Sequence, residues 1–230
     1  MITLGIVGVL AAMTLPGLIN KYNEKVWVTS FLRVYSILEK VYQLALDENG
    51  PVENWSGIGI VNENDTNFNV AKYDDKYFIF NVFKPYLPIA EVYDKEGKKN
   101  CMPDKSYFLN GEAHNIALST YTPTVLLQSG ECIAFGAAYP SMHSFFWVDT
   151  NGKKLPNTLG KDQFLFKFAL HRIAPFGWTD SAADCDISST NANAGKSCGA
   201  WIVRYKNMNY LHLPFDKVEK YWGSSTFYWE

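Results

Sequence analysis

The first nineteen residues, MITLGIVGVLAAMTLPGLI, carry no charged side chain, and this feature constrains the fold more than any other. An apolar run of about 18 or more residues is long enough to cross a bilayer as a helix, at ~1.5 Å per residue. Gly5, Gly8 and Ala12 form a stripe of small residues along which another helix can approach closely. Pro16 removes one helical hydrogen bond and is expected to kink or loosen the segment.

Three interpretations of residues 1–19 compete. A cleaved secretory signal peptide has a basic region before its apolar part, and the sequence shows none. A core helix of a globular protein rarely stays uncharged over such a length. A helix that resides in a membrane agrees best with the pattern, so we expect residues 1–19 to be a single membrane-spanning segment.

The next thirty residues are charged but keep an apolar stripe at helical period. The members of the stripe recur at steps of three and four, whereas Arg33, Glu39 and Lys40 lie off it. The stripe consists of Phe31, Tyr35, Leu38, Tyr42 and Ala45. The triplet Asn49-Gly50-Pro51 ends the pattern, because Gly can close a helix and Pro cannot continue it. The sequence therefore predicts one nearly continuous helix of roughly 45 residues, apolar all round in its first half and amphipathic in its second.

The run ITLGIVGVLAAMTLPGLINKY resembles the N-terminal methylation segment of type IV pilins and type II secretion pseudopilins. Gly5, Gly8, the Ala11-Ala12 pair and Pro16 carry the resemblance, which covers only the start of the chain. In that family a short basic leader ending in Gly and a Phe-Thr-Leu-x-Glu stretch come first. These have no counterpart here, and we expect the sequence to lack the beginning of its precursor.

The resemblance implies a structural subunit of a type IV pilus-like or type II secretion pseudopilus filament that polymerises through its N-terminal helix. Its partners would be other pilin or pseudopilin subunits, an assembly ATPase, membrane platform proteins and, for the full-length precursor, a prepilin peptidase. The implied location is the bacterial cytoplasmic membrane, with one span and an extracytoplasmic globular domain, and a cell-surface filament after assembly. The alternative is a membrane-anchored extracytoplasmic binding protein or adhesin that does not polymerise.

Composition and motifs exclude other classes of function. With 19% charged residues and a net charge of -2, the chain is neither disordered nor basic enough to have nucleic acid as its main partner. Four scattered histidines stand in no nucleophile, metalloprotease or nucleotide-binding motif. They are His114, His143, His171 and His212. We therefore expect no enzyme and no cofactor apart from a possible calcium ion.

Beyond Pro51 short apolar runs alternate with Gly, Asn, Asp and Pro, which indicates strands joined by turns. The expected strands are residues 124–128, 132–135, 145–149, 164–168, 200–205 and 210–213, with Ser129-Gly130 as a hairpin turn. A short helix is expected within residues 73–86, and loops over residues 52–69 and 188–199. Turn-length gaps between consecutive strands indicate an antiparallel sheet.

The expected fold class is α+β and pilin-like, with a long, partly transmembrane N-terminal helix packed on an antiparallel β-sheet. The helix occupies residues 1–50, of which 1–19 form the membrane or filament core and 20–50 are amphipathic. Residues 51–230 form a globular, antiparallel β-rich domain. The aromatic C-terminal tail from Tyr221 to Trp229 is expected to pack on the domain or on a neighbouring subunit.

The chain has four cysteines, an even number, and they are widely spaced. No two of them form a CxxC motif, which argues against a zinc site or thioredoxin-like chemistry. An exported domain would place them in an oxidising compartment. Of three possible connectivities we favour Cys185–Cys198, which closes the polar loop, together with Cys101–Cys132. Four reduced, buried cysteines are the alternative.

The stretch VDTNGKKLPNTLGKDQFLF, residues 148–166, collects oxygen-bearing side chains in a loop between two expected strands. Asp149, Asn151, Asn157 and Asp162 are the hard ligands that calcium prefers. The pattern resembles a DxNGxxxPNxxGxD loop of pilin-like proteins, some of which bind calcium nearby. The other interpretation is an Asx-turn loop whose carboxylates cap backbone N–H groups. Both interpretations stay open at this point.

Overall fold

A computed structural model of the chain describes residues 2–51, 76–93, 100–114, 121–136, 145–169, 172–178, 182–190 and 193–223. Within these ranges only the backbone is described for residues 2–11, 76–79, 121–122, 136, 168–169, 182–183 and 221–223. The expected loop over residues 52–69 and the aromatic side chains of the C-terminal tail lie outside the described residues.

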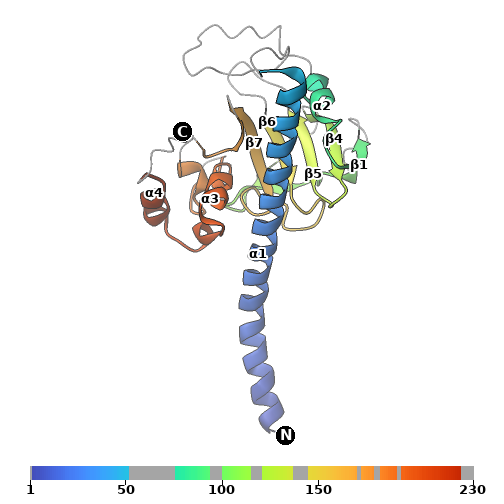
Figure 1. The fold of residues 1–230 in the computed structure, drawn as a ribbon. Coiled ribbons are helices and arrows are strands. Elements are labelled where there is room, and N and C mark those ends of the chain that lie inside the picture. Colours follow the sequence, from blue (N-terminus) through green and yellow to red (C-terminus); the bar gives the residue numbers. More distant parts are fainter. Residues whose placement is uncertain are drawn as a thin grey trace.

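A single helix, α1 (Ile2–Asn49), forms the long axis of the molecule. It runs through Pro16 and ends where the sequence predicted, with Gly50 at a φ of 73° and its N–H bonded to the carbonyl of Leu46. Figure 1 shows that the first half of α1 projects away from the rest of the molecule, whereas the second half lies across the sheet. One helix thus has two different surroundings, as its sequence indicated.

Six antiparallel strands form the sheet, in the order β1-β4-β5-β6-β7-β8. Four of them confirm predicted strands: β4 (Tyr121–Leu127), β5 (Cys132–Gly136), β6 (Phe145–Asp149) and β7 (Gln163–Ala169). The Ser129-Gly130 turn joins β4 to β5, with Gly130 at a φ of 97°. The fold is therefore α+β, with a long helix packed on an antiparallel sheet.

The sheet has two edge strands that the sequence did not reveal, β1 (Ile89–Tyr93) and β8 (Arg172–Pro175). Both are short: β1 directly follows Pro88 and β8 ends at Pro175, and a strand was unexpected beside these prolines. A second sheet consists of the two-residue strands β2 (Ser106–Tyr107) and β3 (Ala113–His114). The expected helix within residues 73–86 is α2 (Lys76–Phe83).

The prediction of a last strand pair was wrong, because residues 200–205 belong to the helix α3 (Cys198–Tyr205) and residues 210–211 to the 3-10 turn η5 (Asn209–Leu211). The run AWIV is too short to separate a helical from an extended period. A disulfide fixes Cys198 at the start of the helix, and Trp201 and Ile202 are buried. A further 3-10 turn, η4 (Ala182–Cys185), precedes α3, and α4 (Phe215–Gly223) follows η5.

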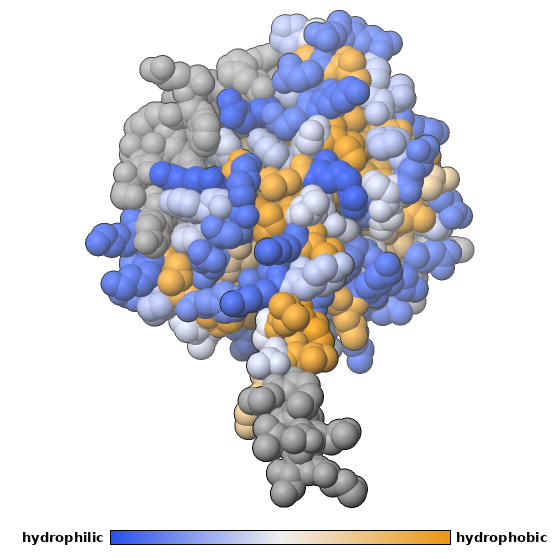
Figure 2. Space-filling model, turned by 60° about the horizontal axis from the view of Figure 1, so that its bottom comes forward, coloured by the Kyte–Doolittle hydropathy of each residue, from blue (hydrophilic) through white to orange (hydrophobic). Residues whose placement is uncertain are grey.

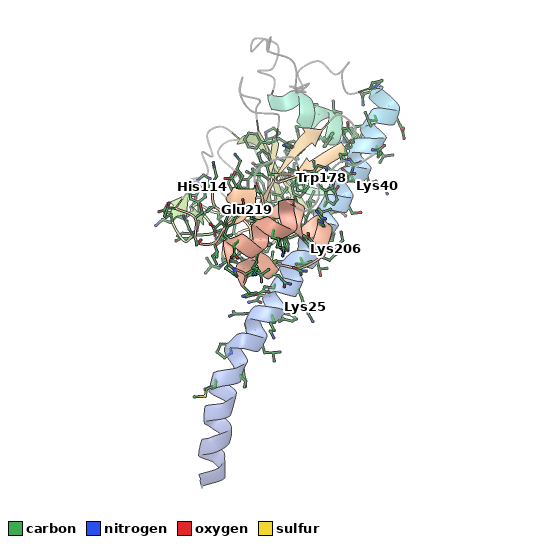
Figure 3. All side chains as sticks on the ribbon, turned by 90° about the vertical axis from the view of Figure 1, so that its left-hand side faces the viewer. Lys25, Lys40, His114, Trp178, Lys206 and Glu219 are labelled. Carbon is green, nitrogen blue, oxygen red and sulfur yellow. A yellow bond between two sulfur atoms is a disulfide. The ribbon has the colours of Figure 1, made fainter. Side chains whose placement is uncertain are left out.

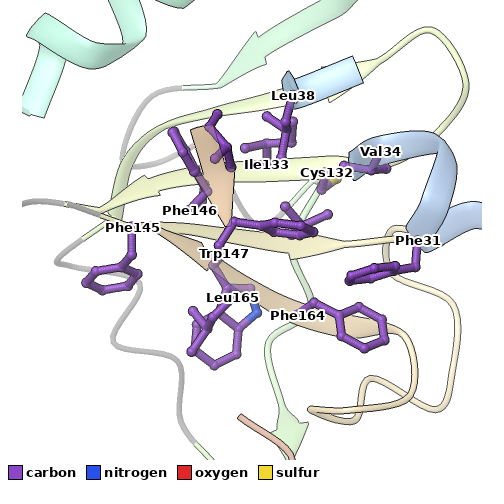
Figure 4. Close-up of a cluster of buried hydrophobic side chains, with 14 of the residues drawn as sticks. Phe31, Val34, Leu38, Cys132, Ile133, Phe145, Phe146, Trp147, Phe164 and Leu165 are labelled. Atoms are coloured by element: carbon purple, nitrogen blue, oxygen red, sulfur yellow. The ribbon is translucent and has the colours of Figure 1, made fainter. Parts of the chain in front are cut away.

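The core lies between α1 and the sheet. Phe31 of α1 is fully buried, and its ring packs edge-on against Phe164 of β7 at 4.5 Å between centroids. Figure 4 shows Phe31, Val34 and Leu38 of α1 among side chains of the central strands. α2 and α3 also contact α1, so the second half of the helix is held by the sheet and by two shorter helices.

Two further expectations differ from the structure. Over the described part of the chain, no helix carries a stretch long and apolar enough to cross a membrane. This finding does not support the expected membrane span over residues 1–19, of which the first eleven have side chains outside the described set. The loop over residues 188–199 is not exposed throughout: Ala194 and Cys198 are fully buried, because the disulfide to Cys185 draws this part of the chain inward.

Candidate functional site

The half of α1 that projects away from the globular domain, called here its free half, exposes large apolar side chains. Met13 is 75% exposed and Leu18 69% exposed, and Leu15, Ile19, Tyr22 and Val26 are also exposed. Figure 2 shows hydrophobic residues gathered on the helix where it leaves the domain, bordered by hydrophilic residues of the domain. Soluble monomers rarely leave a continuous apolar surface of this kind uncovered. This helical surface is therefore the candidate contact surface of the chain.

The residues predicted for helix packing all lie on the free half of α1. Ala12 and Pro16 are both exposed, so the globular domain does not cover them. Gly5 and Gly8 belong to α1, but their environment lies outside the described residues. The stripe of small residues remains a prediction, and its described member, Ala12, is accessible to another helix.

The packed half of α1 is fixed to the sheet by polar contacts as well as by the apolar stripe. The Arg33 guanidinium forms an ion pair with the fully buried carboxylate of Glu131, with Nε 2.6 Å from Oε1. Glu131 directly follows the β4–β5 turn and also accepts a hydrogen bond from the Ser129 hydroxyl. A buried carboxylate without its cationic partner would be strongly destabilising, so this contact fixes the position of the helix along the sheet.

Glu39 makes a second polar contact, with the edge of the sheet. Its carboxylate accepts a hydrogen bond from the backbone N–H of Ile173 in β8, at 2.8 Å. Burial raises the pKa of Glu39, and it raises the pKa of the neighbouring Tyr35 to about 12. The sequence placed Arg33 and Glu39 off the apolar stripe but gave no sign of their partners, because the two contacts join residues 98 and 134 positions apart.

The structure brings the four predicted calcium ligands together in one loop between β6 and β7. Asp162 is the centre of this loop: its carboxylate accepts hydrogen bonds from the N–H groups of Asn157 (2.8 Å) and Thr158 (2.7 Å) and from the side-chain amide of Asn151 (3.1 Å). Asp149 accepts from the N–H of Asn151 at 3.1 Å. Gln163, which the sequence analysis did not single out, donates to Asp149 at 2.9 Å.

Both carboxylates of this loop are fully buried, and this changes their protonation. Burial raises the pKa of Asp162 to about 6, although the three N–H groups bonded to it act in the opposite direction. Burial, with the nearby Asp162 carboxylate, raises the pKa of Asp149 well above its ordinary value. The loop therefore holds two acidic groups whose pKa values both lie above the ordinary value of an aspartate, that of Asp162 at about 6.

The hydrogen bonds of this loop fit a capped turn better than a calcium site. Each of the four carboxylate oxygens of Asp149 and Asp162 already accepts a hydrogen bond from an N–H group. These N–H groups take the place that a cation would need beside the carboxylates. Among the described residues no three acidic, His or Cys side chains gather as metal ligands. In this loop and at its ends, the buried amide oxygens of Asn151, Asn157 and Gln163 have no hydrogen-bond partner among the described residues. The structure thus favours the Asx-turn interpretation.

A close backbone contact joins this loop to the segment before α3. A side chain added at Gly195 would place its Cβ 2.2 Å from the carbonyl oxygen of Leu159, and Gly195 has a φ of 98°. Gly160 faces Gly195 in the same contact, and its carbonyl accepts the hydroxyl of the buried Tyr210 at 2.7 Å. Glycine is required at position 195 by both space and backbone conformation.

Both predicted disulfides are present. Cys185–Cys198 joins η4 to the first residue of α3, with 4.9 Å between Cα atoms, and holds Gly195 against the β6–β7 loop. Cys101–Cys132 joins the segment after β1 to the start of β5, with 5.8 Å between Cα atoms. No free cysteine remains, which confirms the connectivity that the spacing favoured.

The described histidines have structural surroundings. The His114 ring lies between the rings of Phe108 and Trp147, at 4.4 and 5.3 Å between centroids, and burial lowers its pKa. His212 pairs with Glu24 of α1 at 2.8 Å. His143 and His171 lie outside the described residues.

A groove of about 510 Å³ lies where α1 leaves the globular domain. One wall is α1 from Lys21 to Thr29, and the other is the segment from Lys206 to His212. The Glu24–His212 pair connects the two walls. The sequence analysis missed this groove, because its walls are far apart in the chain and were assigned to a helix and to a strand.

Comparison with known proteins gave one match. A family model described as a family of unknown function, DUF6613, matches residues 17–176. The matched segment begins just after Pro16 and contains the packed half of α1 and all strands of both sheets. Searches of curated proteins and of solved structures found no match.

Proposed function

We propose that this chain, which belongs to the DUF6613 family, is a structural subunit of a type IV pilus-like or pseudopilus filament and polymerises through its N-terminal helix. One observation carries the proposal: a single 48-residue helix is packed on an α+β domain by one half and exposes large apolar side chains on the other half. The resemblance of residues 2–22 to the pilin methylation segment supports it.

The physical argument concerns what can cover Met13, Leu15 and Leu18. A bundle of such helices from several copies would remove these side chains from water. Transfer of the helix from lipid into a bundle costs little, because both surroundings are apolar, and small residues such as Ala12 then favour close packing. A filament with these helices at its centre and the globular domains outside satisfies both halves of α1.

Before assembly, the same apolar half is proposed to hold the subunit in the bacterial cytoplasmic membrane with its domain on the extracytoplasmic side. The two disulfides support an exported domain, because such bonds persist in oxidising compartments. Other subunits, an assembly ATPase and membrane platform proteins are the proposed partners, with a prepilin peptidase acting on the precursor. The proposed role is structural and not enzymatic.

Cross-linking between copies tests polymerisation. In a Met13→Cys/Leu18→Cys variant of the full chain, expressed with its assembly partners, mild oxidation should join copies into a ladder of covalent oligomers. Both positions are exposed, and no native free cysteine is available to compete. The matched control is Lys153→Cys/Lys154→Cys, two exposed positions on the β6–β7 loop, which should give few cross-links.

The outcome separates the proposal from its rival. A ladder specific to positions 13 and 18 supports polymerisation through α1. Membrane-bound monomers without intermolecular cross-links would contradict it and favour an anchored binding protein or adhesin.

A further inference from the structure

The groove at the foot of the globular domain is positively charged. Lys21 and Lys25 stand one helical turn apart on α1, and Lys206 lies at the end of α3 on the opposite wall. Figure 3 places Lys25 and Lys206 where α1 leaves the domain, and Lys40 farther along the helix. Within the described part of the chain, none of the three groove amines has an ion-pair or hydrogen-bond partner.

The groove contains one carboxylate, Glu24, and two apolar side chains beside its lysines. The Glu24 carboxylate contacts His212 at 2.8 Å, and the three lysines outnumber it, so these amines and this carboxylate together carry a net positive charge. Val28 belongs to the α1 wall and Met208 to the opposite wall, and both side chains are buried. A groove with three amines and one carboxylate fits a ligand that carries an anionic group.

The groove also lies at a defined height above the apolar end of α1. At ~1.5 Å per residue, Lys21 stands about 3 Å and Lys25 about 9 Å beyond Ile19 along the helix. The polar headgroup region is roughly 5–8 Å thick on each side of a bilayer, so both amines reach it when Ile19 marks the edge of the hydrocarbon.

We propose that this groove binds the phosphate of an anionic glycerophospholipid in the leaflet from which α1 emerges. The proposal rests on the membrane-held state of the proposed function and adds a lipid partner to it. The three lysines supply the positive charge that binds the phosphate. Binding would hold the globular domain at a fixed height on the membrane before assembly.

Site-resolved lysine labelling tests the proposal. The full chain is reconstituted into vesicles of phosphatidylcholine alone or of phosphatidylcholine with phosphatidylglycerol, and reacted with a water-soluble amine reagent. Mass spectrometry then gives the labelling rate of each lysine. Lys21, Lys25 and Lys206 should react at least ~3-fold more slowly in the anionic vesicles, and the difference should shrink at high salt. Lys40 and Lys154, which are exposed elsewhere, should react equally in both.

A variant adds a second readout. Given a choice between the two kinds of vesicle, the native chain should float preferentially with the anionic one. The triple variant Lys21→Gln/Lys25→Gln/Lys206→Gln should lose this preference. The matched control Lys40→Gln/Lys153→Gln/Lys154→Gln removes the same charge from exposed positions outside the groove and should keep it.

The remaining outcomes overturn the proposal in distinguishable ways. A chain that floats with both vesicles and is labelled equally in both has no headgroup site, although its membrane residence stands. A chain that floats with neither overturns both. Protection by inorganic phosphate alone, in neutral detergent and to the same extent, would indicate a general anion site. Protection that grows with protein density in phosphatidylcholine vesicles would show that a second copy covers the groove.

Discussion

Replacement of Phe31 by Ala tests whether α1 and the sheet form one cooperative unit. The Phe31 side chain is fully buried, and its ring packs edge-on against Phe164 at 4.5 Å and stacks with Phe166 at 5.3 Å. On its other side it faces Gly199 of α3, where an added Cβ would lie 3.4 Å from the ring. Truncation to Ala therefore leaves a cavity between the helix, β7 and α3.

The expected loss of unfolding free energy is about 4 kcal/mol, since buried Phe→Ala substitutions cost roughly 3–5 kcal/mol. Leu18→Ala on the same helix is the matched control. Leu18 is 69% exposed, and an exposed substitution should change the stability of the monomer by less than about 0.5 kcal/mol.

Urea unfolding in one neutral detergent, followed by tryptophan fluorescence with the disulfides intact, measures both changes. The midpoint should fall for Phe31→Ala at an unchanged dependence on urea, and stay constant for Leu18→Ala. Equal shifts in the two variants, or a loss below about 1 kcal/mol for Phe31→Ala, would refute the division of α1 into a packed and a free half.

Three further predictions concern the β6–β7 loop. Burial raises the pKa of Asp162 from 3.8 to about 6 in the folded chain, so the stability that its protonation contributes should be complete below pH 3.8 and be lost as the pH rises through 6. The native chain should lose about 3 kcal/mol of unfolding free energy over this pH range. The urea midpoint should therefore fall with rising pH less steeply in Asp162→Asn than in the native chain. An equal pH dependence in the two proteins would contradict the raised pKa of Asp162. Gly195→Ala should destabilise by at least about 3 kcal/mol, because its Cβ meets the Leu159 carbonyl, whereas Gly111→Ala, at a similar φ but in open space, should cost about 1 kcal/mol; a similar melting point for both variants would be evidence against the close contact. Calcium at millimolar concentration, added after chelation, should leave the melting temperature unchanged, since the carboxylates of this loop are capped by N–H groups; a rise of several degrees would restore the metal interpretation.

The elements that the sequence predicted well are those with a strong local signal. An uncharged segment followed by an amphipathic stripe and by Gly50-Pro51 defined α1 almost to the residue. Residues 145–149 are a strand as expected, and all five are buried because β6 lies in the middle of the sheet with both faces covered. The disulfide pairing followed from spacing and from the closure of one polar loop.

The contacts that were missed depend on tertiary structure. Nothing local distinguishes Glu131 as the buried partner of Arg33, because the pair is ninety-eight residues apart. The helix α3 was mistaken for a strand, since its short apolar run suits either form until the disulfide and the packing on Phe31 decide. The basic groove also depends on tertiary structure: Lys206 lines the same groove as Lys25 because the helix α3 ends beside α1.

Electron cryomicroscopy of the assembly that the full-length chain forms with its partners tests the central claim most directly. The account predicts a filament with a central bundle of α1 helices, in which Met13 and Leu18 contact neighbouring copies, and with the six-stranded sheets outside. Single copies with α1 in lipid, or a filament joined through the globular domains with the free half of α1 uncovered, would contradict it.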